Sequence, residues 1–447
     1  MEVCTVGGFE EVGKNMTAVK VDDDVFIFDA GLYIPGVVEL QEEDARQEYT
    51  MSSLRRVGAV PDERVLDKLE WRDKVRAIFL SHAHLDHVGG LPYLLDRYPN
   101  VPIYGTAFTL KLLELILRDD KKVLTNPLRV IKSDSTHIIK GKSGEYKIDF
   151  IHTTHSTIQC VFLALYTKEG VFFYALDLKF DNYPTMGRPP SYKKMEEAGK
   201  RGVKVLVLDA LYSYTEKRPG SETVAKHMLE EAFSRITDKK AALFVTTFSS
   251  HVERLNNIVE FARRTKREIV FLGRSLSKYM EAATLIGKCP FRNHVKIIKY
   301  RRQINSYLKR IELNRGKYLV ICTGHQAEEN SILDRITKGE TPFKFRAGDN
   351  LIFSTGVIPT PVNIAARSKM DATLRKRGVK LQIDVHVHGH GSRDDMRELL
   401  RLTRPEHIIP AHGSIQQETP MIELANDYGY KLGETSHLTT NGNVLKF

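Results

Sequence analysis

Three histidines and one aspartate within six residues constrain this chain more than any other feature. The stretch "SHAHLDHVGG" (Ser81–Gly90) directly follows the apolar run "VRAIFL". Histidine and aspartate are poor strand formers, and a core strand does not bury so many polar groups without partners. The spacing H-x-H-x-D-H places imidazoles and a carboxylate on both sides of a tight turn, as two neighbouring divalent cations require. The sequence therefore predicts a metal site whose remaining ligands come from elsewhere.

The length of the chain and its cysteines limit the class of protein. A chain of 447 residues is too long for one hydrophobic core, so we expect at least two domains. No segment approaches the roughly 20 apolar residues of a membrane span, and the N-terminus lacks the basic and apolar regions of a signal peptide. The cysteines are scattered and form no C-x-x-C pair, which is typical of small core residues in a reducing cytoplasm. They are Cys4, Cys160, Cys289 and Cys322.

The net charge favours a polyanionic partner. The formal charge is +11 and the isoelectric point is near 9.2. Two stretches are strongly basic, Arg292–Lys317 and Arg367–Lys380. Each alone is equally well explained as a solvated helix face. Together with a metal site, they make nucleic acid the favoured partner.

The first 208 residues resemble a strand-rich sandwich. Residues 16–21, 24–31, 74–81 and 102–105 are β-like runs that end in turn residues. Residues 106–120 have helical spacing, with Thr106 as the expected N-cap. Polar residues at the strand ends predict a site on one edge of this sandwich.

The pattern changes from Val203 onward. Residues 203–210, 240–248, 268–273 and 318–324 are continuous apolar runs, each followed by a helix-like stretch. This is typical of parallel strands that crossover helices cover on both faces. After about residue 370, residues 381–392 and 407–414 return to short strands with histidines at their ends. The chain is therefore expected to be an α/β protein with a doubly wound domain in the middle.

Four more predicted strands are followed by metal-ligand residue types. A single such residue is more often an ordinary core or surface side chain. Four of these stretches, in a chain that already holds H-x-H-x-D-H, favour ligands. They supply His155, Asp177, the trio His386, His388 and His390, and finally His412.

The ordered motifs resemble the metallo-β-lactamase fold with an inserted β-CASP domain, and most closely the ribonuclease J family. The motifs are "GGFEEVGKNM", "FIFDAGLYIP", "SHAHLDHVGG", "DLKFD", "HVHGHGS" and "IIPAHG", and the resemblance runs from about residue 5 to 420. It implies an αββα sandwich interrupted by a doubly wound α/β domain. The expected boundaries are 1–208 and 371–447 for the sandwich and 209–370 for the insertion.

The resemblance also implies a ligand set for two metal ions. His82, His84 and His155 would hold one ion, Asp86, His87 and His412 the other, and Asp177 would bridge them. The family's ion is usually zinc, which suits imidazoles and carboxylates without thiolate, and manganese is chemically acceptable. Asp29 matches an aspartate that orients a ligand from behind; the alternative is a plain turn residue at a strand end.

Catalysis needs a group that protonates the leaving oxygen opposite the attacking hydroxide. The resemblance assigns this role to His390, supported by Asp209. A carboxylate beside an imidazole keeps it protonated and oriented, as a general acid near pH 7 requires.

The predicted inserted domain carries candidate phosphate-binding loops. Three of its strands end in loops that open helices, with Ser250 and Glu253 spaced as a capping box. Ordinary capping without a ligand is the alternative. The resemblance implies a pocket for an RNA 5′-monophosphate there. The chain departs from the family pattern at His325, Ala327 and His388, all in loops that contact phosphate in the family. The candidate phosphate ligands are Ser249, Ser250, Arg274, Ser275, Gly324, His325, Gln326, His386 and His388.

These observations predict a cytoplasmic ribonuclease with two metal ions, acting on single-stranded RNA from the 5′ end, with endonuclease cleavage as an additional activity. One rival is a β-CASP endoribonuclease of the mRNA 3′-end-processing type, which shares every metal ligand. The other is a non-catalytic RNA-binding subunit, which the full ligand set disfavours. The sequence leaves RNA sequence preference, the resident metal and a homodimeric state open.

Overall fold

The computed structural model describes residues 1–43, 49–358 and 360–447, which fall into two compact units. The first unit comprises residues 1–182, 188–219 and 389–447. The second comprises residues 183–187 and 220–388. Within the described ranges, no helix is long and apolar enough to cross a membrane. Each unit is described by itself.

The first sheet of the first unit has seven strands among the described residues, in the order β19-β1-β2-β3-β4-β5-β6. Strands β19, β1, β2 and β3 pair antiparallel, and β3, β4, β5 and β6 pair parallel. The bounds are β1 (Glu2–Gly7), β2 (Met16–Val21), β3 (Asp24–Phe28), β4 (Val75–Phe79), β5 (Ile103–Thr106), β6 (Leu128–Ile131) and β19 (Asn443–Lys446).

The second sheet of this unit has six strands in the described chain, in the order β18-β11-β10-β9-β8-β7. Strands β7 to β10 pair antiparallel, whereas β11 runs parallel to both β10 and β18. The bounds are β7 (Ser135–Lys140), β8 (Glu145–His152), β9 (Val161–Thr167), β10 (Gly170–Ala175), β11 (Val203–Asp209) and β18 (His407–Ala411).

Side-chain alternation on β10 explains how the layers of the first unit are held together. Phe172 and Tyr174 point into the core between the two sheets, and Val171, Phe173 and Ala175 point into the core under the outer helices. Because successive side chains of a strand face opposite sides, one strand serves both cores. A strand buried on both faces is therefore apolar throughout, as the sequence of β10 is.

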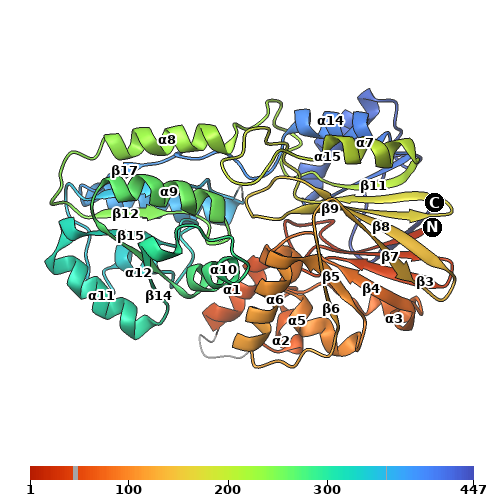
Figure 1. The fold of residues 1–447 in the computed structure, drawn as a ribbon, viewed down its shortest axis with the longest axis horizontal. Helices are drawn as coiled ribbons and strands as arrows, with labels where there is room; N and C mark the ends of the chain where they lie inside the picture. The colour runs from red at the N-terminus through yellow and green to blue at the C-terminus, as the bar shows by residue number, and fades with distance from the viewer. Residues whose placement is uncertain (44–48, 359) are drawn as a thin grey trace. The chain divides into compact units, whose positions relative to one another are not determined.

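Helices cover the outer faces of the two sheets. α7 (Tyr192–Lys200), α14 (Arg393–Thr403) and α15 (Ile415–Asp427) contribute to the core outside the second sheet (Figure 1). α6 (Ala107–Asp119) packs against β5 and β6, and Thr106 is its N-cap as the sequence predicts. The shorter helices are α1 (Ile34–Glu43), α2 (Met51–Arg56), α3 (Val65–Lys68), α4 (Leu85–Val88) and α5 (Leu91–Leu94). The predicted αββα sandwich is present.

The second unit is built on a sheet in which every described strand pair is parallel. Its order is β14-β13-β15-β12-β16-β17, with β12 (Leu243–Thr246), β13 (Glu268–Leu272), β14 (Val295–Ile298), β15 (Tyr318–Cys322), β16 (Asn350–Phe353) and β17 (Lys380–Gln382). α8 (Glu222–Ser234) precedes β12, and the helices that connect these strands are α9 (Val252–Arg264), α10 (Arg274–Leu285), α11 (Arg301–Leu313), α12 (Ile332–Lys338) and α13 (Pro361–Lys376). This is the predicted doubly wound arrangement.

The stretch of residues 381–392 differs from its prediction as a short strand. Strand β17 ends at Gln382, and the histidines that follow lie on irregular backbone. Asp384 has a φ of +61°, a left-handed conformation that a strand does not contain. The histidine-rich segment is therefore a connection, and its histidines do not share a strand's alternation.

Candidate metal centre

The turn after β4 is held in place by the loop after β3. Ala30 N donates to the carbonyl of His87 at 2.8 Å, and Leu32 N donates to that of Leu85 at 2.9 Å. A Cβ atom on Gly31 would overlap the carbonyl oxygen of Asp86, so only glycine permits this approach. The histidine-rich turn is thus fixed by main-chain bonds before any ion binds.

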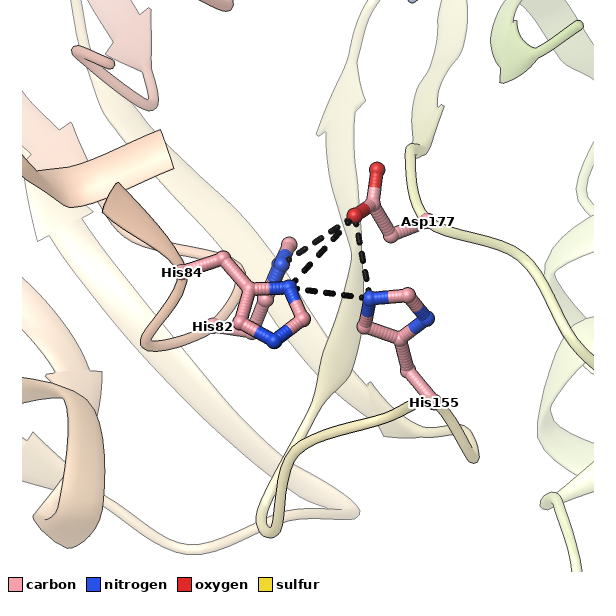
Figure 2. A group of neighbouring side chains, drawn as sticks. All are labelled: His82, His84, His155 and Asp177. Atoms are coloured by element: carbon pink, nitrogen blue, oxygen red, sulfur yellow. Dashed lines mark hydrogen bonds and ion pairs between the residues drawn. The ribbon is translucent and has the colours of Figure 1, made fainter. Parts of the chain in front are cut away.

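Four side chains from three separate stretches form the first candidate group: His82, His84, His155 and Asp177. Figure 2 shows that ring nitrogens of the three histidines face one carboxylate oxygen. This Oδ2 atom of Asp177 lies 3.1 Å from His155 Nε2, 3.3 Å from His82 Nε2 and 3.9 Å from His84 Nδ1. The stretches meet because each follows a strand of the sandwich at the same edge.

A second candidate group contains Asp86, His87, His412 and again Asp177. The other carboxylate oxygen, Oδ1 of Asp177, lies 3.1 Å from His87 Nε2 and 3.7 Å from His412 Nε2. Asp86 Oδ2 is 3.8 Å from both of these imidazole nitrogens. Each oxygen of one buried carboxylate therefore faces a different group of ligand atoms.

The donor set fits divalent cations. Imidazole nitrogens and carboxylate oxygens are ligands that zinc accepts, and no thiolate is present in either group. Two buried atoms, His82 Nε2 and Asp177 Oδ1, have no hydrogen-bond partner among the described residues. Since buried polar atoms are normally satisfied, such a pair is accounted for by ligation of a metal ion.

Three residues of the centre have left-handed backbone. The φ angles are +54° at Asp177, +62° at His412 and +59° at Asp29. Non-glycine residues rarely adopt this conformation, and it is concentrated at functional sites. The surrounding fold therefore holds the backbone of these residues in an uncommon conformation, and this backbone sets the direction of their side chains.

Asp29 lies behind the ligands. Its Oδ2 accepts a hydrogen bond from His87 Nδ1 at 2.7 Å and another from the Ser81 hydroxyl at 2.7 Å. Its Oδ1 accepts from Ser81 N at 2.8 Å. The contact with Nδ1 leaves His87 Nε2 for the metal, which is the arrangement expected of a carboxylate that orients a ligand.

His390 and Asp209 form a pair beside the two groups. Nδ1 of His390 lies 2.7 Å from Asp209 Oδ2, and Nε2 lies 4.0 Å from Asp177 Oδ2. Asp209 is 1% exposed, whereas the His390 side chain is 18% exposed. The buried carboxylate of Asp209 thus holds Nδ1 of the imidazole, while the partly exposed ring directs Nε2 toward Asp177.

Burial and neighbouring charges set the protonation of the centre. Burial lowers the pKa of His155 to about 3 and that of His82 well below its usual range, so both imidazoles are neutral, as metal ligation requires. Burial also lowers the pKa of His390, but the carboxylates of Asp209 and Asp177 outweigh it and raise the pKa to about 9. Burial lowers the pKa of His87 too, but the carboxylates of Asp177, Asp29 and Asp86 raise it well above its usual range. The centre therefore combines two neutral imidazoles, His82 and His155, with two whose pKa is raised, His87 and His390.

Sequence reasoning missed Asn15. Its amide Nδ2 lies 3.1 Å from His87 Nε2 and 2.8 Å from His412 Nδ1, and it is fully buried. The residue sits in the loop before β2, within "GKNM", and asparagine in a turn carries no signal that separates it from other loop asparagines.

The candidate phosphate loops gather in the second unit. The Ser249 and Ser275 hydroxyls are 2.5 Å apart, which joins the loops after β12 and β13. Gln326, after β15, donates to the carbonyl of Gly356 at 2.9 Å and accepts from Ile358 N at 2.9 Å. Each of these loops follows the carboxyl end of a parallel strand.

The predicted capping box at Ser250 is wrong. The N-cap of α9 is His251, whose side chain accepts from Arg254 N. The carboxylate of Glu253 instead accepts hydrogen bonds from the main chain of Thr185 and Met186. These donors lie far away in the sequence, so the spacing of Ser250 and Glu253 could not reveal them.

The other predicted phosphate ligands also lie in the second unit. His386 and His388 belong to the second unit, with ring centroids 5.2 Å apart, while His390 belongs to the first. His325 is 3% exposed, and its ring packs edge-on against Phe248 with centroids 4.3 Å apart. Arg274 begins α10 and is exposed.

Comparisons with known proteins identify the family. "Metallo-beta-lactamase superfamily" matches residues 10–189, "Ribonuclease J, beta-CASP domain" matches residues 240–369, and "Zn-dependent metallo-hydrolase RNA specificity domain" matches residues 378–431. Ribonuclease J of Pyrococcus abyssi is 38% identical over 100% of this chain and 97% of its own length. The chain belongs to the ribonuclease J family. It is therefore a metal-dependent ribonuclease.

Further relatives agree with membership of the ribonuclease J family. Ribonuclease J of Methanocaldococcus jannaschii is 36% identical over 100% of this chain and 99% of its own length. The crystal structure of a protein of unknown function from Enterococcus faecalis V583 aligns with a TM-score of 0.63 at 18% identity, covering 99% of both chains. That likeness shows the shared fold alone. The predicted fold, a metallo-β-lactamase sandwich with a β-CASP insertion, is confirmed.

Proposed function

We propose that this ribonuclease degrades single-stranded RNA from the 5′ end, that it prefers a 5′-monophosphate, and that it uses two zinc ions. The observation that supports the proposal is that the candidate phosphate loops follow neighbouring strands of the β-CASP unit, above all the contact of Ser249 with Ser275. Internal cleavage is a secondary activity of the same centre. Manganese also suits the nitrogen and oxygen ligands.

The ligand assignment follows from the two groups of side chains. His82, His84 and His155 would hold one ion, and Asp86, His87 and His412 the other. Asp177 would bridge them, because its two oxygens face different groups. Bound divalent cations supply Lewis-acid activation of the phosphodiester and of the attacking water.

His390 acts as the general acid in this proposal. Asp209 fixes its Nδ1, which leaves the protonated Nε2 directed at the centre, 4.0 Å from Asp177 Oδ2. A proton delivered to the leaving oxygen neutralises the charge that develops when the P–O bond breaks. Asp209 positions this imidazole and does not contact the substrate.

The 5′-phosphate pocket would be formed by the loops at Ser249–Ser250, Arg274–Ser275 and Gly324–Gln326. Main-chain N–H groups at helix starts favour a terminal dianion over an internal diester, since the dianion carries more charge for the same contacts. The buried ring of His325 packs on Phe248, so we assign the phosphate contacts in this loop to the main chain and not to the imidazole. His386 and His388 are the further candidates for phosphate contacts.

The endoribonuclease of the 3′-end-processing type remains the alternative, because it would share the metal centre and differ in the pocket. The experiment compares initial rates on one RNA sequence with a 5′-monophosphate, 5′-triphosphate or 5′-hydroxyl. The monophosphate should be degraded fastest, and Arg274→Ala should remove most of that preference. Arg264→Ala is the matched control, since it deletes an exposed arginine of α9 that pairs with Glu230. Equal rates on all three ends would support the endonuclease.

A further inference from the structure

Arg335 on α12 is a buried arginine with no carboxylate oxygen within 4.0 Å among the described residues, and Glu340 acts on it only from a greater distance. It is 5% exposed. Its Nη2 lies 3.5 Å from Asn305 Oδ1, and its Nε has no hydrogen-bond partner among the described residues. A guanidinium withdrawn from water is costly unless acceptors surround it. Arg335 therefore favours an anion from outside the chain.

Two other arginines of the same unit show what ordinary burial looks like. Arg254, 1% exposed, donates two hydrogen bonds to the carboxylate of Glu222 at 2.7 and 2.9 Å. Arg367, 5% exposed, donates to Asp371 at 2.8 Å and to a main-chain carbonyl at 3.0 Å. Arg335 is as buried as Arg367 and lacks such an acceptor. Its environment is thus unusual within its own unit.

A second cation and a helix start lie beside Arg335. Burial, and next the charge of Arg301, lower the pKa of Arg335, and the charge of Glu340 opposes them only in part. Asn305, which contacts Arg335, lies one turn after Arg301 on α11, and the N-cap residue Tyr300 makes no side-chain capping bond. The first N–H groups of a helix and its dipole attract anions. Arg335 therefore contacts the second turn of a 13-residue helix that begins with Arg301, and the charge of Arg301 acts on it.

The exposed face of α11 is positively charged. Arg301, Arg302, Lys309 and Arg310 are exposed, and no described carboxylate lies within 4.0 Å of them. By contrast, Arg264 on α9 pairs with Glu230 at 2.7 Å. A helix face that is only solvated usually mixes both signs of charge, as α9 does. The charge of α11 is complementary to a polyanion.

Aromatic rings lie among these cations. Tyr300 is 58% exposed and immediately precedes Arg301. Lys296 and Arg310 lie 4.9 and 5.1 Å from the ring centroid of Tyr307. An exposed ring in a basic surface is typical of proteins that stack unpaired bases of single-stranded RNA or DNA.

The location also suits a ligand. α11 follows the carboxyl end of β14, and Gly273 N donates to the carbonyl of Ile298 at 3.0 Å. This bond joins the end of β14, two residues before Tyr300, to the residue that precedes Arg274. Ligands of open parallel sheets collect at such carboxyl ends. The basic site thus lies along the same sheet edge as the candidate 5′-phosphate loops.

We propose that Arg335, Arg301 and the first turn of α11 bind an internal phosphate of single-stranded RNA, and that Tyr300 stacks on a neighbouring base. The inference rests on the proposed function only in taking RNA as the ligand. It does not require a 5′-phosphate, because an internal diester is present whatever the state of the end. Its failure is therefore separable from failure of the 5′-end preference.

The test is equilibrium binding of a 5′-hydroxyl single-stranded RNA to the metal-loaded full chain, in a His390→Ala background so that the RNA survives. Combining Arg301→Ala with Arg335→Gln should weaken binding about tenfold and reduce the slope of log affinity against log salt by about 0.7, the value for one single-strand phosphate. Tyr300→Ala should weaken RNA binding by roughly tenfold without changing the salt slope. Tyr300→Phe, which keeps an aromatic ring, should bind RNA as tightly as the chain with Tyr300. The control, Arg263→Ala with Arg264→Ala, removes the same charge from α9.

Equal binding by the test and control variants would overturn the proposal. So would a result in which inorganic phosphate stabilises the wild type but not Arg335→Gln while RNA affinity is unchanged, since the site would then take a free anion. If Arg335→Gln fails to fold, substitution of the exposed residue Arg301 tests the proposal instead. Arg301→Glu must then weaken RNA binding clearly more than Arg264→Glu, and parity between them would reject the site.

Discussion

His390 donates from Nδ1 to a carboxylate oxygen of Asp209 at 2.7 Å, and Asp209 itself is almost fully buried. The pair joins a residue from the end of β11 to one in the histidine-rich connection, 181 positions apart in sequence. A buried carboxylate in this position keeps the imidazole protonated and fixes which nitrogen faces the metal centre. The first two predictions below follow from this relationship.

Replacing His390 by Ala should slow cleavage by about 10²–10⁴-fold, as expected when a general acid is lost. Both metal ions should remain bound, because the two ligand groups are complete without it. Single-turnover rates and metal analysis of the same preparation check this. Loss of a metal ion would mean that His390 is a ligand and not the acid.

Replacing Asp209 by Asn should move the alkaline limb of the pH–rate profile to lower pH. The Asp209 carboxylate helps to raise the pKa of His390 to about 9, against the effect of burial. Without this charge the imidazole loses its proton at lower pH, so kcat/KM should fall more at pH 8 than at pH 6. A profile that is lowered equally at every pH would assign Asp209 a structural role only.

Replacing Asp177 by Ala should abolish hydrolysis and lower the metal content, since one carboxylate faces both ligand groups. Replacing Asp29 by Ala is the milder companion, because it touches His87 from behind. That variant should lose metal affinity by about 10–100-fold and recover activity when metal is added in excess. Full activity of Asp177→Ala with two metal ions per chain would refute the bridging assignment.

Replacing Glu418 by Gln should stabilise the protein increasingly as pH rises. Glu418 is fully buried, and burial, followed by the charges of Glu11 and Glu10, raises its pKa to about 10. In the unfolded chain it ionises near 4.5, so its contribution to stability is full below that pH and declines as pH rises toward 10. In this window each pH unit lowers the free energy of unfolding by about 1.4 kcal/mol, so the total loss at pH 7 is about 3 kcal/mol.

Thermal unfolding at a series of pH values measures this effect. The difference in Tm between Glu418→Gln and wild type should be small near pH 5 and large at pH 8 to 9. Glu423→Gln is the control, because it makes the same change at an exposed position of the same helix, α15. A constant difference across the pH range would mean that Glu418 ionises normally.

The elements that the sequence predicts well are those whose pattern is local. The run at Met16–Val21 is a strand with the predicted bounds, and His82 to His87 lie together because the turn itself places them. The buried strands β11 and β15 are mainly apolar runs between turn residues. Strands covered on both faces have this pattern, whereas strands with one face in water alternate apolar and polar residues.

The elements that the sequence does not predict depend on distant residues. β14 and β16 are four-residue strands between charged stretches, too short to show a period. Asn15 contacts His87 because β1 and β2 place their connecting loop beside the candidate metal centre. The carboxylate of Glu253 does not cap its helix and instead accepts hydrogen bonds from the main chain of Thr185 and Met186. The lack of a hydrogen-bond partner for Arg335 Nε among the described residues is likewise known only from the structure.

The most direct test of the account is a product-length series from one RNA, labelled at either end and carrying a 5′-monophosphate. The account predicts that the 5′ label appears at once as mononucleotide while the 3′-labelled strand shortens progressively, and that circular RNA of the same sequence is cut far more slowly. Internal fragments of intermediate length from both labels, with circular RNA cut as fast as linear RNA, would contradict 5′-end degradation and establish the endonuclease alternative.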